Sequence, residues 1–149
     1  GLRRPLSVGL LIAAAGLLWF AHAPAQGEMM RDIVPGMLLL GLGAGMAFNP
    51  LLLAAMSEVS PSESGLASGV VNTAFMMGGS LGLAVLASLA ASRTSDAILN
   101  GLLQPEAYTV GFQLAFAVGA IFAGVAALMS WLLREPAGPG SAGAMPAAH

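Results

Sequence analysis

The chain has 149 residues, of which 57% are hydrophobic and only 8% are charged, and its formal net charge is −2. A soluble domain carries about 25% charged residues, so this composition indicates an integral membrane protein and leaves no basic footprint for nucleic acid. The absence of cysteine excludes disulfides and thiolate metal sites. Because the two histidines, His22 and His149, are far apart in sequence, we expect no metal centre and no cofactor.

The first predicted span covers residues 6–23, directly after Arg3 and Arg4. Two arginines, an apolar run and small residues are also compatible with a secretory signal peptide. However, 18 apolar residues make a full membrane span rather than the shorter core of a signal peptide, which favours a spanning helix. Since the sequence begins with glycine rather than methionine, we expect a C-terminal piece of a longer polypeptide.

The second predicted span covers residues 33–56, with Asp32 as its expected N-cap. Pro50 lies inside this span and removes a helical N–H, which predicts a kink. In a membrane such a break persists where protein or a water-filled cavity satisfies the freed groups. The kink is therefore either the wall of a cavity or simple helix packing.

The third predicted span covers residues 61–92, and its part from Gly65 to Ser92 contains no charged side chain. Ser60 and Glu63 fit a capping box, which predicts a helix start near Pro61. Glycines four residues apart let membrane helices approach closely, and we expect other helices of this chain to pack on them. Such pairs are Gly41/Gly45, Gly65/Gly69 and Gly78/Gly82.

The fourth predicted span covers residues 111–133. The connection before it, residues 93–110, has apolar residues at helical spacing, which predicts a short amphipathic helix on the membrane surface. Residues 135–149 are rich in glycine, alanine and proline and are expected to be disordered. The four spans together predict an all-α membrane protein.

The arginines give a weak orientation signal. Arg3, Arg4 and Arg134 fall on one side of the predicted membrane topology, and Arg31 and Arg93 fall on the other. The positive-inside rule then places both ends of the chain in the cytoplasm.

No catalytic motif is present, and none of the spans carries an ionisable residue at mid-depth. Buried amides need partners, so Asn49 and Asn72 are expected either to face a substrate pathway or to form hydrogen bonds between helices. Flexible apolar residues beside them would complete a hydrophobic binding surface, or would simply pack against helices or lipid. These are Met46, Phe48, Phe75 and Met76.

The segment GLGAGMAFNPLLLAAMSEVSPSESGLASGVVNTAFMMGGSLGLAVL resembles the late C-terminal part of major facilitator superfamily permeases. It is most similar to fourteen-helix drug:proton antiporters of the EmrB/QacA type. The resemblance implies the last four helices of that fold, with a cavity-lining second helix and a third helix at the contact between the two halves. It also implies proton-coupled efflux of small amphipathic molecules across the plasma membrane, together with the remaining helices of the same permease.

The chain departs from that pattern after Asn72-Thr73, where the family commonly has a polar or charged pair. Here the sequence reads Ala74-Phe75-Met76-Met77, so the coupling residues are expected outside this chain. The alternative is a non-transporting membrane scaffold or anchor subunit assembled through its glycine-rich faces. A membrane-embedded enzyme is disfavoured because the spans lack titratable groups.

Overall fold

The computed structural model describes residues 3–132, and every regular element in that range is helical. Four helices are long and apolar enough to cross a membrane, which confirms the all-α membrane prediction. The elements are α1 (Arg3–Ala21), the π-helical turn η1 (Met29–Ile33), α2 (Val34–Met56), α3 (Ser64–Leu99) and α4 (Gln104–Ser130). The predicted tail 135–149 and Arg134 lie outside the described residues.

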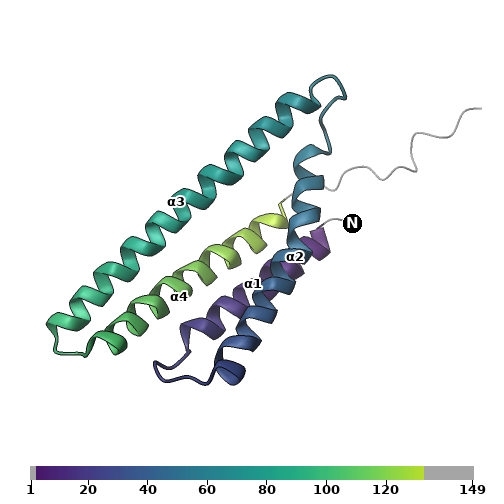
Figure 1. Ribbon diagram of the computed structural model, residues 1–149. Helices are drawn as coiled ribbons and strands as arrows, with labels where there is room; N and C mark the ends of the chain where they lie inside the picture. The colour runs from purple at the N-terminus through teal and green to yellow at the C-terminus, as the bar shows by residue number, and fades with distance from the viewer. Residues whose placement is uncertain (1–2, 133–149) are drawn as a thin grey trace, which may run out of the picture.

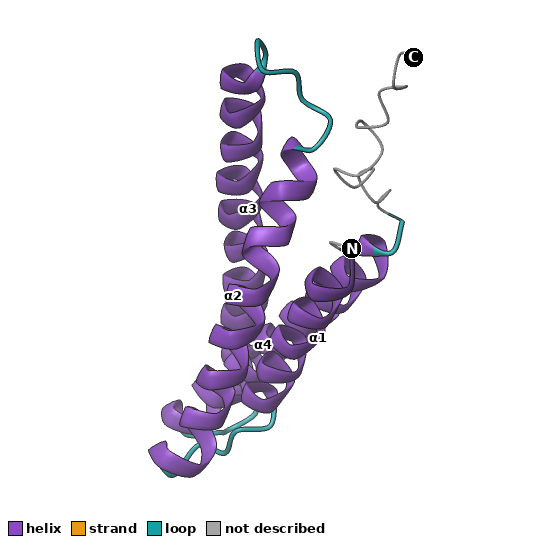
Figure 2. Ribbon diagram, turned by 90° about the vertical axis from the view of Figure 1, so that its right-hand side faces the viewer, coloured by secondary structure: helices purple, strands orange, loops and turns teal. Residues whose placement is uncertain are grey.

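Helix α1 packs against both α2 and α4, and α3 packs against α4. The α1–α2 and α3–α4 connections lie at one end of the bundle, and the α2–α3 connection lies at the other (Figures 1 and 2). Neighbours in sequence therefore run antiparallel, as expected for a chain that crosses a membrane repeatedly. We call the end with the α1–α2 and α3–α4 connections the double-loop end.

A very close contact joins α1 to α2 through glycines. A Cβ placed on Gly9 would lie 2.8 Å from the carbonyl oxygen of Gly43, and one on Gly16 would lie 2.8 Å from the backbone nitrogen of Leu40 and 3.0 Å from the carbonyl oxygen of Gly36. No real side chain tolerates such distances to backbone atoms, so only glycine allows this approach. We call these four glycines the α1–α2 seam. They are spaced seven residues apart on each helix, whereas the glycine pairs predicted from the sequence are spaced four apart.

The contact between α3 and α4 is confined to the double-loop end. Gly111 of α4 lies against Ala90 and Thr94 of α3, and the buried residues of α3 begin only at Ala90. A helix of 36 residues is about 54 Å long, well beyond a hydrocarbon core of about 30 Å. Helix α3 is therefore longer than one membrane crossing along the bilayer normal requires.

This geometry corrects the prediction for residues 93–110. No separate surface helix forms there, because α3 continues to Leu99 and α4 already begins at Gln104. Gly101, with a φ of +90°, ends α3, and the Leu102 N–H donates to the Ala97 carbonyl as in a glycine-terminated helix. The dipeptide Asn100-Gly101 is a stop signal that the sequence contained.

Both predicted caps are also wrong. Asp32 accepts the N–H of Glu28 through Oδ2 at 2.8 Å, while Ile33 stands at the N-cap of α2. The Ser60 hydroxyl donates to Glu63 Oε2 at 2.7 Å, and α3 begins at Ser64 with no side-chain cap bond. In each case the polar side chain closes a local turn and so does not reach the first amides of the helix.

The glycine pairs predicted to pack within this chain do not do so. A Cβ built on any of them would have no atom within 4 Å among the described residues, which holds for Gly41, Gly45, Gly65, Gly69, Gly78 and Gly82. The expectation that the other helices of this chain cover them is therefore wrong. Their use as a packing surface for helices outside this chain stays a prediction.

Candidate functional site

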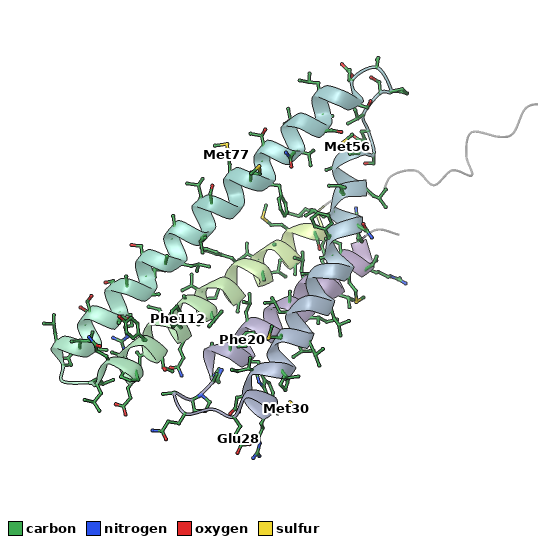
Figure 3. The ribbon with its side chains drawn as sticks, in the orientation of Figure 1. Phe20, Glu28, Met30, Met56, Met77 and Phe112 are labelled. Atoms are coloured by element: carbon green, nitrogen blue, oxygen red, sulfur yellow. The ribbon has the colours of Figure 1, made fainter. Side chains whose placement is uncertain are left out.

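A groove of about 580 Å³ lies between the C-terminal part of α2 and the N-terminal part of α3. Its lining residues on each helix are spaced three and four apart, so each helix contributes one continuous face. Helix α2 contributes Phe48, Leu51, Leu52, Ala55 and Met56, and α3 contributes Ser68, Val71, Asn72, Ala74 and Phe75. Met56 marks the end of the groove where the chain turns from α2 toward α3 (Figure 3).

The two helices face each other across this groove with little direct packing, and two aromatic rings connect them. The rings of Phe48 and Phe75 meet edge to face, with their centroids 5.7 Å apart and an interplanar angle of 86°. This geometry is favourable for aromatic pairs. The pair bridges the two walls of the groove, and the remaining lining beside it is mostly apolar.

Of the six residues predicted for a substrate pathway, three line the groove. They are Phe48, Asn72 and Phe75. Met46, Asn49 and Met76 do not line it, although their side chains are exposed on α2 and α3. Pro50 is buried inside α2, which stays helical on both sides of it. Since proline lacks an N–H, the carbonyl of Met46 loses its helical partner.

Asn72 and Ser68 supply the polar groups of the groove, and no ionisable side chain is among its lining residues. An amide can both donate and accept hydrogen bonds. The arrangement can therefore hold an apolar molecule and orient one polar group of it, and it offers no residue for proton transfer. Among the described residues, no three acidic, histidine or cysteine side chains gather as a metal site would require.

The double-loop end carries polar contacts that the sequence did not reveal. Gln113 of α4 donates from Nε2 to the carbonyl of Ala23 at 2.8 Å, and Trp19 donates from Nε1 to the main-chain oxygen of Asp32 at 2.9 Å. These bonds join α4 and α1 to the α1–α2 connection. The only sequence signal for them was a polar or amphipathic residue near each predicted membrane boundary.

Comparison with known proteins identifies relatives that carry resistance and export names. The puromycin resistance protein pur8 of Streptomyces alboniger is 34% identical over 89% of this chain. The tetracenomycin C resistance and export protein of Streptomyces glaucescens is 32% identical over 76% of the chain, and the multidrug resistance protein Stp of Mycobacterium tuberculosis is 30% identical over 71%. The chain spans only 28%, 21% and 18% of these three proteins, respectively.

The comparison with solved structures finds no match. The family model described as Major Facilitator Superfamily matches residues 1–148, which is nearly the whole chain. This match agrees with the four spanning helices. The chain belongs to the Major Facilitator Superfamily.

Proposed function

We propose that the complete protein containing this chain is a secondary transporter that exports small amphipathic molecules, and that the groove between α2 and α3 forms part of the substrate route. The observation that carries this proposal is an apolar groove between two spanning helices that holds one amide and a pair of aromatic rings. The resistance and export names of the relatives also support an export function.

The lining suggests how a substrate binds. Apolar side chains and two rings favour a molecule with a hydrophobic body, at about 25 cal/mol per Å² of apolar surface removed from water. The Asn72 amide would bind one polar group and set the orientation of the molecule. Because the remaining contacts are not directional, the groove would accept several molecules of similar size.

Energy coupling belongs to the part of the protein outside this groove. We infer that the transporter is a proton antiporter of the fourteen-helix drug-export type whose titratable groups lie on other helices, because the groove lining has none. We place it in the plasma membrane. The arginine distribution supports a cytoplasmic location for both ends of the chain.

The test is export of puromycin, the compound named for one relative, by cells that produce the complete protein. Phe75→Ala removes a ring that lines the groove, and Met76→Ala removes an exposed neighbour that does not. We expect about tenfold weaker transport for Phe75→Ala, the equivalent of one lost aromatic contact, and nearly normal transport for Met76→Ala.

A second pair repeats the comparison with amides. Asn72→Leu should impair export, whereas Asn49→Leu, on α2 but outside the groove lining, should impair it less. Equal export by all four variants at equal protein levels would remove the groove from the substrate route. If the complete protein reached the membrane but exported nothing, the scaffold alternative would replace the transporter proposal. The outward-facing glycines favour that alternative.

A further inference from the structure

Two cavities meet at Asp32, at the opposite end of α2 from the groove. One cavity, of about 540 Å³, is lined by Trp19, His22 and Asp32 together with three neighbouring residues of α1 and its end. The other, of about 290 Å³, lies between the α1–α2 connection and α4 and includes Asp32, Phe112 and Gln113 in its lining. Asp32 is the acidic side chain in both linings.

The carboxylate of Asp32 retains unused hydrogen-bonding capacity. Its Oδ2 accepts the Glu28 N–H at 2.8 Å, while an ionised carboxylate offers about four acceptor positions. Gly27 contributes to this space, because a Cβ there would lie 2.9 Å from Oδ2. Asp32 is half-buried, so its charge is screened less by water than that of a fully exposed carboxylate.

The other polar groups of these cavities also favour a donor as ligand. Gln113 uses its Nε2 to donate to Ala23, which leaves its Oε1 as an acceptor. His22 Nδ1 lies 2.8 Å from the Leu18 carbonyl. Because a carbonyl only accepts, Nδ1 carries the proton, and Nε2 is the acceptor in the neutral ring.

Aromatic rings complete the surroundings on both sides of Asp32. The bond from Trp19 Nε1 to the Asp32 main-chain oxygen fixes the indole beside this residue. Phe20 and Phe116, with ring centroids 5.2 Å apart, line the smaller cavity together with Phe112. Phe20 lies on α1 and Phe112 lies on α4, while Glu28 projects from the α1–α2 connection (Figure 3).

The charges at the double-loop end favour positive ligands. Within residues 3–132 this end carries four acidic side chains, Glu28, Asp32, Asp96 and Glu106, against the two arginines Arg31 and Arg93. An excess of acidic groups raises the local concentration of cations. A carboxylate, carbonyl-type acceptors and aromatic faces together are the groups that bind an organic ammonium ion.

We propose that the smaller of the two Asp32 cavities binds an organic ammonium ion, with the carboxylate on the charged nitrogen and the ring of Phe112 on the attached carbons. This site goes beyond the proposed export route, because it lies away from the groove between α2 and α3 and binds by charge. The affinity of this site for a ligand can be measured at equilibrium without an ion gradient, so its test does not depend on transport.

The experiment is isothermal titration calorimetry of the purified complete protein with benzylammonium, and with benzyl alcohol as the uncharged probe of nearly the same size. Asp32→Asn removes the charge but keeps an oxygen that can accept the Glu28 N–H, so the turn is retained. Glu28→Gln is the matched control, because it removes a neighbouring charge that lines neither cavity.

We expect Asp32→Asn to weaken benzylammonium binding about tenfold or more, as for the loss of one hydrogen bond to a charged group. Glu28→Gln should change the affinity less than twofold, and benzyl alcohol should bind equally weakly to all three proteins. Equal losses of benzylammonium affinity in Asp32→Asn and Glu28→Gln would show that the acidic surface as a whole attracts the cation. That result, or benzylammonium binding that is insensitive to Asp32→Asn, would overturn the proposal.

A second pair tests the aromatic contribution independently of charge. Phe112→Leu removes an exposed ring from the smaller cavity, whereas Phe122→Leu removes a similarly exposed ring elsewhere on α4. A cation–π contact at such a site corresponds to about a twofold to fivefold change in affinity. We expect that loss only for Phe112→Leu, and equal affinities for the two variants would count against the ring contact.

Discussion

The glycines where α1 meets α2 and those in the first part of α3 have opposite surroundings. In the α1–α2 seam, glycine backbones approach until no side chain fits. Along residues 64–89 of α3 no residue is buried, and the glycines face open space. The presence of glycine in a membrane helix therefore does not indicate where its partner lies.

The spacing of the glycines accounts for part of this difference. Helices that cross at a shallow angle meet again every seven residues, or two turns, and Gly9/Gly16 face Gly43/Gly36 with this period. A spacing of four suits a steeper, right-handed crossing that needs its own partner helix. Within residues 3–132 no helix crosses α3 in that way near Gly65 or Gly69.

The largest effect is expected from breaking the seam. In Gly43→Ala the new Cβ would lie 2.6 Å from the Gly9 carbonyl oxygen and would also clash with the backbone N of Ala13. We expect the complete protein to lose about 3 kcal/mol or more of its free energy of unfolding, at the upper end of overpacking effects. The measurement is thermal unfolding in detergent followed by circular dichroism.

Gly45→Ala is the matched control, two residues away on the same helix with nothing near its Cβ. It should cost clearly less than Gly43→Ala, because no atom of the described residues lies near its Cβ and alanine is the better helix former. Similar unfolding temperatures for Gly43→Ala and Gly45→Ala would mean that the seam is not a close contact.

The sequence predicted the four spans because uncharged runs of 18 residues or more have few alternative structures. It did not predict the ends of α3 and α4, since the Asn100-Gly101 stop lies beyond the charged residues Arg93 and Asp96, which suggested a loop. Charge marks where a helix leaves the membrane, whereas its end depends on local backbone signals. A helix can therefore extend past the membrane boundary.

The groove was predictable only in part. Phe48, Asn72 and Phe75 line it, whereas Met46 and Asn49 lie elsewhere on α2. Because α2 is apolar around its whole circumference, hydrophobicity does not indicate which face meets α3. Once Phe48 and Phe75 are known to pair, steps of three and four residues lead to the remaining lining residues.

A smaller effect is expected from weakening the contact between α4 and the α1–α2 connection at the double-loop end. Gln113→Leu removes the hydrogen bond to Ala23 and leaves that carbonyl without this donor. We expect a loss of about 1 kcal/mol in the free energy of unfolding, measured in the same unfolding assay. Gln104→Leu, at the exposed start of α4, should change stability by less than half as much, and a reversed order would contradict the role assigned to Gln113.

The last and smallest effect is expected at Gly69 and concerns accessibility rather than stability, because no atom of the described residues lies within 4 Å of an added Cβ there. The relatives are several times longer than this chain, so helices outside it are available to cover α3. Because the chain has no cysteine, Gly69→Cys introduces a single reactive thiol here. We expect a lipid-soluble thiol reagent to label Gly69→Cys in the complete protein more slowly than Ile121→Cys, on an exposed position of α4. Any native cysteines outside this chain are first replaced by serine. Equal labelling rates would leave the α3 glycines facing lipid, and the contrast with the seam would then hold for the complete protein rather than for these four helices alone.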